Sequence, residues 1–313
     1  MMGELWNVSS SPHVRNRLGT QNLMFDVVLA LLPAAAFGIY RFGPYALCVL
    51  LVAVGFALLT EYTYEACVEK ENTLWDGSAL VTGLLLGMNL PPFVPLWIPM
   101  LGSIFAILVV KQLFGGIGQN VVNPAMAARC FLLISFADQM NQYSGMDGLS
   151  GATPLEALKN GGTVDLAAMF TGFTTGTIGE ISTLALLAGG IYLLIKGVID
   201  WVIPVMYLVS FALFMAVFGG HGLDPSYLAA QLCGGGLMIG AWFMATDYTT
   251  SPITEKGRFV YAVFLGILTG IFRLWGASAG GVSYALVTAN LLVPLIEKNT
   301  IPKAFGWEGQ KDG

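Results

Sequence analysis

The sequence predicts an all-α polytopic membrane protein with about ten transmembrane helices in two inverted repeats of five, in which the third and eighth helices are interrupted. The first reason is composition: 56% of the 313 residues are hydrophobic and only 11% are charged, against about 25% in a typical soluble domain. The second is that apolar runs of about twenty residues recur, each long enough to cross a hydrocarbon core of about 30 Å. The third is a similarity between the two halves of the chain.

Five apolar segments are expected on each side of a longer polar segment. The predicted spans are residues 24–40, 44–66, 77–93, 96–114, 122–137, 181–197, 201–218, 227–245, 258–273 and 280–296. The chain then divides into a cytoplasmic N-terminal segment (1–23), a first five-helix repeat (24–137), an external loop (138–180), a second, inverted five-helix repeat (181–297) and a cytoplasmic tail (298–313).

The similarity between the halves appears at a constant offset. It aligns KQLFGGIGQNVVNPAMAARCFLL (111–133) with FRLWGASAGGVSYALVTANLLVP (272–294). The matched pairs are Leu113 with Leu274, Phe114 with Trp275, Gly115 with Gly276, Val121 with Val282, and Ala128 with Ala289. Because each repeat has an odd number of spans, the second is inverted relative to the first. Transporters often use this architecture and place their site at the repeat interface.

Each predicted third span of a repeat ends in a polar or proline-rich stretch. These stretches are LLLGMNLPPFVP (84–95) and FMATDYTTSPIT (243–254). Proline removes a backbone donor, and carbonyls freed within lipid need partners in protein or water. The paired positions predict a site at the centre of the pseudo-symmetry. The alternative is that both stretches are ordinary span ends followed by proline loops.

The placement of lysine and arginine predicts the orientation. With a cytoplasmic N-terminus, one face collects Arg15, Arg17, Lys70, Lys111, Lys196, Lys256, Arg258, Lys298, Lys303 and Lys311. The opposite face collects only Arg41, Lys159 and Arg273. Both termini are therefore expected in the cytoplasm, and the 138–180 segment outside.

Charged residues inside a membrane are costly and usually face the protein interior. Glu61 in the second span, Asp76 before the third and Asp247 at the second interruption are candidates for an ion pathway. Asp76 is equally well explained as a helix N-cap. Arg129 lies midway through the fifth span and needs an anionic partner, either a carboxylate such as Glu61 or a bound phosphate. A structural ion pair explains Arg129 as well as a ligand site does.

Several kinds of site are not predicted. The four cysteines are scattered and form no CxxC pair, which argues against a metal site of the zinc or iron–sulfur type. The two histidines, His13 and His221, fall outside the predicted spans, so a bis-histidine haem in the membrane is not expected. No basic stripe suggests nucleic acid as a partner.

The polar segment contains DGLSGATPLE (147–156). Thr153, Pro154 and Glu156 fit a capping box, with proline at the first helical position of a short helix. By itself this pattern predicts only an N-cap.

Four motifs together resemble a known family. They are GGIGQNVVNPAMAARCFLLISF, LVTGLLLGMNLPPFVPLW, FMATDYTTSPITEKGR and SGATPL. From about Asn16 to about Glu297 they resemble the D subunit of the Rnf complex and its paralogue, the B subunit of the sodium-pumping NADH:quinone oxidoreductase. The short polar start favours the Rnf protein. Three alternatives remain open: a protein like that B subunit, a non-redox channel or transporter of inverted-repeat fold, and a purely structural anchor.

The resemblance implies an electron-transfer subunit in a prokaryotic plasma (inner) membrane complex that couples electron flow between ferredoxin and NAD to sodium or proton translocation. It implies FMN joined by a phosphoester to the threonine of an S-G-A-T motif, here Ser150, Gly151, Ala152 and Thr153. A flavin transferase that uses FAD would make this bond, and Arg129 is a further candidate for cofactor binding. The resemblance also allows a second, noncovalent flavin, riboflavin or FMN. The expected partners are the other Rnf subunits, because this chain lacks the sites for NAD and ferredoxin and is not a complete enzyme alone.

Overall fold

The computed structural model describes residues 19–69, 73–143, 153–160, 162, 164–276 and 281–302. All regular secondary structure in these residues is helical, which confirms the predicted all-α class. Within this described part, three helices are long and apolar enough to cross a membrane: α1 (Thr20–Phe42), α2 (Pro44–Val68) and α13 (Glu255–Trp275). A bent pair of helices would make a fourth, and several shorter helices are also apolar. The fold is that of a polytopic membrane protein, and the count of ten spans remains a prediction.

The first half of the chain continues after α2 through short helical elements. They are η1 (Leu74–Asp76), α3 (Ser78–Met88), α4 (Trp97–Ile104), η2 (Phe105–Gln112) and α5 (Pro124–Ser135). The η2 element is a π-helix that continues α4. Pro124 begins α5, and the side chain of Asn123 caps it by accepting hydrogen bonds from two backbone amides.

A middle segment of short helices precedes the second half. It contains α6 (Ala137–Met140), α7 (Pro154–Lys159) and α8 (Leu166–Thr171). The second half contains α9 (Thr183–Ile195), α10 (Val202–Phe218), α11 (Pro225–Cys233), α12 (Leu237–Ile239), the π-helix η3 (Gly240–Met244), α13 and α14 (Val282–Thr300).

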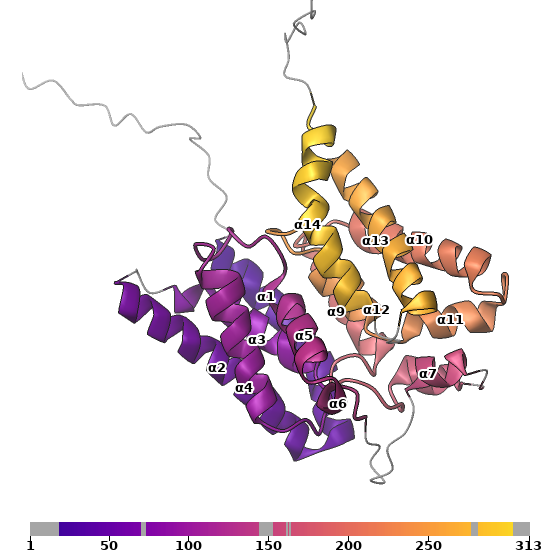
Figure 1. Cartoon of the computed structure of the whole chain (residues 1–313), viewed down its shortest axis with the longest axis horizontal. Coiled ribbons are helices and arrows are strands. Elements are labelled where there is room, and N and C mark those ends of the chain that lie inside the picture. The colour runs from indigo at the N-terminus through magenta and orange to yellow at the C-terminus, as the bar shows by residue number, and fades with distance from the viewer. Residues whose placement is uncertain are drawn as a thin grey trace, which may run out of the picture.

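The two halves lie side by side, with the indigo and magenta helices next to the orange and yellow ones (Figure 1). Within the first half α2 packs on α3, α4 and η2, and within the second half α10 packs on α13, which packs on α14. Between the halves α1 contacts α9 and α5 contacts α14. Gly189 on α9 permits the first of these contacts, because a Cβ there would lie 2.1 Å from the carbonyl oxygen of Ala30.

The described end of α14 lies at the opposite end of the molecule from α6 and α7 (Figure 1). This arrangement agrees with a predicted topology in which the C-terminal tail and the Thr153 segment are on opposite sides. Which side faces the cytoplasm remains a prediction. Most of the predicted segments 1–23 and 298–313 lies outside the described residues.

The interruptions differ from their predicted positions. The stretch 84–95 contains the end of α3, and α4 begins only at Trp97; likewise η3 ends at Met244 and α13 begins at Glu255. Both stretches are therefore helix ends followed by loops, as the alternative interpretation held. The eighth segment is interrupted earlier, at residues 234–236, where α11 and the following helix meet at 65°. Three consecutive glycines explain this position, because Gly235 and Gly236 have φ values of +69° and +70° that other residues rarely adopt.

Candidate functional site

Thr153 is the N-cap of α7, as the capping pattern predicts. Its Oγ1 accepts a hydrogen bond of 3.4 Å from the backbone N–H of Glu156, and Pro154 is the first helical residue. The side chain of Thr153 is half-buried. The other three residues of the predicted attachment motif, Ser150, Gly151 and Ala152, lie outside the described residues.

The helix α7 is held against the interruption of the eighth segment. Its buried Leu155 lies on the glycine turn, where a Cβ on Gly235 would come within 2.3 Å of Leu155 Cδ1. At the other end of α7, Lys159 Nζ donates a hydrogen bond of 2.9 Å to the carbonyl oxygen of Gly276. The glycine turn thus both breaks the helix and makes room for the segment that carries Thr153.

A cavity of about 560 Å³ opens beside Thr153. Thr153 lines it together with Arg129 from α5, Tyr143 and Glu180, and with apolar side chains such as Leu133. Pockets for small ligands and cofactors typically measure about 300–1,000 Å³ and combine apolar walls with a few polar groups. The structure therefore brings together the two residues that the sequence named separately for cofactor binding, Thr153 and Arg129.

Arg129 is buried, with 4% of its surface exposed. Its Nη1 donates a hydrogen bond of 2.8 Å to Asn89 Oδ1, and its Nη2 lies 3.8 Å from Glu180 Oε2. Its Nε is buried and has no hydrogen-bond partner in the described part of the chain. Buried donors are nearly always satisfied, so this unpaired N–H is an exception to the usual pattern.

The carboxylate nearest Arg129 is Glu180 and not Glu61, which the sequence offered as one example of an anionic partner. The last turn of α3 packs on α5 and presents Asn89 to Arg129, while a backbone bond of 2.8 Å from Gly179 N–H to the carbonyl of Met88 holds the Glu180 segment alongside. Glu61 belongs to α2 and pairs instead with Lys111 on η2. Sequence alone could not choose between the acidic partners, because this choice depends on which helices touch.

Tyr143 adds a neutral hydrogen-bonding group to the same cavity. Burial raises the pKa of Tyr143 to about 12; Glu180 also raises it, and Arg129 acts in the opposite direction. The phenol therefore keeps its proton at neutral pH and is able to donate a hydrogen bond. Sequence analysis missed this residue, which lies in a polar segment with no recognisable motif.

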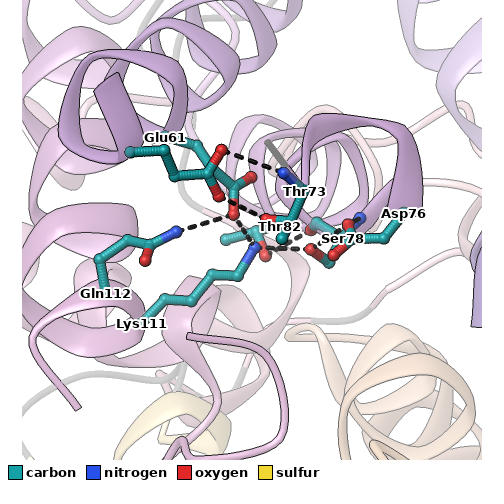
Figure 2. A network of polar contacts seen from close by, with 8 residues as sticks. Glu61, Thr73, Asp76, Ser78, Thr82, Lys111 and Gln112 are labelled. Atoms are coloured by element: carbon teal, nitrogen blue, oxygen red, sulfur yellow. Dashed lines mark hydrogen bonds and ion pairs between the residues drawn. The ribbon is translucent and has the colours of Figure 1, made fainter. Parts of the chain in front are cut away.

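A second polar cluster lies in the first half of the chain (Figure 2). Its centre is Lys111 on η2, which forms an ion pair and hydrogen bond with Glu61 and donates a hydrogen bond of 2.5 Å to Ser78 Oγ. Gln112 Nε2 donates a further hydrogen bond of 2.9 Å to Glu61 Oε1. Lys111 is 2% exposed and Glu61 is 0% exposed, so both charges are removed from solvent.

Asp76 joins this cluster at its half-buried edge. Its Oδ1 accepts hydrogen bonds from the backbone N–H and the Oγ of Ser78, at 2.8 and 2.6 Å. The first bond places the Asp76 carboxylate at the first amide of α3, but the N-cap residue is Gly77, so the structure does not confirm Asp76 as the N-cap. The second bond links Asp76 through Ser78 to Lys111, so two of the predicted ion-pathway residues, Asp76 and Glu61, belong to one network.

Asp247 lies in the loop that follows η3. Its carboxylate accepts hydrogen bonds from Thr249 and Thr250, at 3.1 and 3.3 Å from their hydroxyls, and one of 3.5 Å from Asn123. Asp247 and Lys111 line the same small cavity, of about 80 Å³. Lys111, which the sequence analysis counted among the charges of the cytoplasmic face, therefore binds Glu61 directly, connects to Asp76 through Ser78 and shares a cavity with Asp247.

Arg273 was counted among the charges of the outer face, at the end of a predicted span, and the structure buries it. Its Nη2 donates a hydrogen bond of 2.5 Å to the carbonyl oxygen of Gly234, and its Nη1 donates to Gln231 Oε1 at 3.1 Å. Arg273 thus satisfies carbonyls at the end of α11, where the helix is interrupted. Residues at predicted span ends can face either water or the protein, and only the packing shows which.

Comparisons with known proteins agree with these features. The sequence model of the NQR2, RnfD, RnfE family matches residues 7–306. The chain is 45% identical over 307 residues to the D subunit of the Na⁺-translocating ferredoxin:NAD⁺ oxidoreductase complex of Acetobacterium woodii, covering 96% of this chain and 95% of that protein. It is 41% identical to the D subunit of the proton-translocating ferredoxin:NAD⁺ oxidoreductase complex of Clostridium ljungdahlii, covering 96% of each chain. It is 37% identical to the D subunit of the ion-translocating oxidoreductase complex of Stutzerimonas stutzeri, covering 93% of each chain.

Proposed function

Because the chain belongs to the NQR2, RnfD, RnfE family, we propose that it is the electron-transferring D subunit of an Rnf complex and carries FMN in a phosphoester bond to Thr153. It is a membrane subunit of an ion-translocating ferredoxin:NAD⁺ oxidoreductase complex, and the other Rnf subunits are its partners. The alternative of a protein like the B subunit of the quinone reductase is less favoured, because the relatives described above are all named as D subunits.

The observation that carries the flavin proposal is the cavity shared by Thr153 and Arg129. Its volume of about 560 Å³ suits a flavin ring system, and its walls combine apolar side chains with polar groups, as cofactor pockets do. The unpaired Nε–H of Arg129 supplies a donor that the described protein residues leave unused. The residues present therefore fit the cofactor.

The position of Thr153 is compatible with esterification. Its Oγ1 is the acceptor in the bond from Glu156 N–H, so the hydroxyl proton is not needed to hold the cap. A transferase that uses FAD would join this oxygen to the FMN phosphate, release AMP and remove that proton. The new phosphate would lie near the first amides of α7, a favourable place for an anion. Glu156 is exposed, and its carboxylate is expected to turn away from the added negative charge.

The FMN, when bound, supplies the one-electron chemistry; the protein supplies its tether, orientation and electrostatics. Arg129 would donate its Nε–H to an electron-rich atom of the ring, and Tyr143 would donate through its phenol. Leu133 and the buried Ile181 would exclude water from the ring faces. Glu180 lies near enough to Arg129 to limit the positive charge that the ring experiences.

Mass analysis of the peptide containing Thr153 tests the attachment. Protein made with the flavin transferase is expected to carry an FMN-sized addition on Thr153, and Thr153→Ala is expected to abolish the addition and the in-gel flavin fluorescence. Thr174→Ala is the matched control, since Thr174 lines the same cavity. Full peptide coverage with an unmodified Thr153 in the native complex would refute the proposal.

The remaining parts of the proposal concern the membrane. The family favours a prokaryotic plasma membrane, and the charge distribution favours cytoplasmic termini and an external Thr153. Glu61, Asp76 and Asp247 would form the ion route; Asp247→Asn is expected to lower the number of ions moved per electron, and unchanged coupling would remove Asp247 from the route. A second, noncovalent flavin gains no support from the cavity beside Asp247, which at about 80 Å³ is below the usual size for such a ligand.

A further inference from the structure

Lys111 is the buried cation that connects the predicted ion-pathway carboxylates. Lysine is almost never fully buried unless it is paired, and here the pairing partner is the equally buried Glu61. The residue lies on the π-helix η2, and π-helical turns occur frequently at functional sites. The position therefore calls for an explanation beyond the packing of an apolar helix.

The ammonium group of Lys111 binds Glu61 and Ser78, and Ser78 leads on to the half-buried Asp76. Lys111 also lines the cavity of about 80 Å³ together with Asp247 and Asn120. The Oδ1 of Asn120 is buried and has no partner within the described residues. A rotation of the flexible four-carbon side chain of Lys111 would be needed to carry its ammonium from Glu61 toward these acceptors.

Glu61 also has unused capacity to bind a cation. Its Oε1 accepts hydrogen bonds from Lys111 and Gln112, whereas its Oε2 is buried without a partner in the part of the chain that the structure describes. Sodium is a hard cation that takes oxygen ligands, and a proton binds a carboxylate directly. In the described residues no group of three or more His, Cys, Asp or Glu side chains could hold a metal ion. A cation bound at Glu61 would compete with the Lys111 ammonium for the same carboxylate.

We propose that Lys111 is a tethered counter-cation that neutralises Glu61 while no transported ion is bound and moves toward Asp247 and Asn120 when the ion arrives. The inference rests on the proposed function, because it assumes that the complex moves sodium ions or protons past Glu61. Charge is conserved in the exchange: one monovalent cation leaves the carboxylate as another binds. Movement of Lys111 into the cavity shared with Asp247 would then couple the two halves of the molecule.

If Lys111 competes with the transported cation for Glu61, substitutions of Lys111 should change the cation concentration that gives half-maximal transport. In Lys111→Met no lysine competes for Glu61, so the cation concentration that gives half-maximal transport is expected to fall at least tenfold. The maximal number of ions transported per electron is expected to fall as well, because Lys111 no longer assists ion release from Glu61. In Lys111→Arg the larger planar guanidinium keeps its charge at Glu61 and does not fit the small cavity. The half-maximal cation concentration is therefore expected to rise at least tenfold.

The experiment uses the whole complex in proteoliposomes, with ion uptake and electron flow measured together. In one arm the sodium concentration is varied and the uptake of radioactive sodium is measured. In the other arm sodium is absent, the pH is varied and internal acidification is measured, so that a tenfold change in the half-maximal proton concentration appears as a shift of one pH unit. Lys196→Met is the matched control, since Lys196 is 52% exposed and lies on another helix. Its half-maximal concentration is expected to match that of the unchanged protein.

Two outcomes overturn the inference. If Lys111→Arg has the same half-maximal cation concentrations as the unchanged protein, Lys111 serves only as a structural partner of Glu61. Because this variant keeps the buried pair charged, it remains informative even where Lys111→Met does not assemble. A rise in the half-maximal concentration in Lys111→Met would contradict competition. FMN on Thr153 is measured in the same samples, so absence of the flavin refutes the proposed function, whereas a normal flavin content with unchanged cation dependence refutes only the role of Lys111.

Discussion

The cavity beside Thr153 and the network around Lys111 each contain a buried cationic side chain, and the two differ in how completely they are paired. Arg129 bonds to Asn89 and interacts with Tyr143, has a carboxylate at 3.8 Å and an unpaired Nε, and lines a cavity of about 560 Å³. Lys111 is paired directly with Glu61 and lies beside a cavity of only about 80 Å³. An incompletely paired cation next to open space indicates a ligand that the protein chain does not supply. A fully paired cation in a tight network indicates a charge whose partner must be replaced before it can move.

The largest effect is expected in the Lys111 network. Lys111→Met leaves Glu61 buried without its cation, and breaking one side of a buried ion pair costs about 3–5 kcal/mol. Thermal unfolding of the purified complex in detergent is therefore expected to show a strong loss of stability. The double variant Lys111→Met/Glu61→Gln removes both charges and is expected to recover most of the loss. If the double variant were as unstable as the single one, charge pairing would not be what holds η2 against α2.

A smaller effect is expected at the glycine turn below the cavity. Gly235→Ala places a residue with a Cβ at φ +69°, which costs about 1–2 kcal/mol, and drives that Cβ to 2.3 Å from Leu155. Displacement of α7 is expected to reduce the flavin attached to Thr153, as measured by in-gel fluorescence. Gly197→Ala is the matched control, because Gly197 has the same φ of +69° but nothing within 4 Å of its Cβ position. Equal flavin loss in both variants would show that backbone strain, and not the contact with Leu155, is responsible.

Arg129 should affect the flavin itself. Arg129→Gln removes a charged hydrogen-bond donor from the cavity, and such a bond contributes about 1.5 kcal/mol or more. Because the reduced, more electron-rich ring loses more than the oxidised ring, the two-electron reduction potential is expected to fall by about 30 mV or more. Redox titration of the flavin bound to Thr153 measures this shift. An unchanged potential with normal flavin content would mean that Arg129 does not contact the ring.

The smallest effect concerns the cap of α7. Without the transferase, Thr153→Ala is expected to cost about 1 kcal/mol, because the Glu156 amide loses its acceptor. Thr153→Ser keeps the hydroxyl and is expected to stay within a few tenths of a kcal/mol of the unchanged protein. Thermal unfolding of the unflavinylated protein compares the two. A loss of stability in Thr153→Ala far above the cost of a lost helix cap would mean that the Thr153 methyl group packs in the cavity wall.

Much of the frame follows from the sequence. The observed helices α1 and α2 fall close to the predicted spans 24–40 and 44–66, because a long apolar run has few alternatives to a helix in a membrane. The cap at Thr153 follows from residues that are adjacent in the chain. The interruption of the eighth segment was placed at 243–254 although CGGG at 233–236 is a strong local signal, because proline was given more weight than consecutive glycines.

The sequence could not predict which buried side chains pair with each other. Lys111 and Glu61 are 50 residues apart, and Arg129 and Asn89 are 40 residues apart. Both cations lie in apolar surroundings where several carboxylates were available as partners. Only the packing of α2 on η2, and of α3 on α5, determines which side chains meet.

The sequence by itself determined where this chain is apolar, approximately where its long helices α1 and α2 lie, and which threonine stands at the start of α7. These features depend on neighbouring residues, since hydrophobic runs and caps are satisfied within a few positions of the chain. The tertiary structure alone decided that Thr153 and Arg129 share one cavity and that Lys111 lies among Glu61, Asp76 and Asp247. The reason is physical: a buried charge must find its partner across a helix interface, and that interface exists only after the helices have packed.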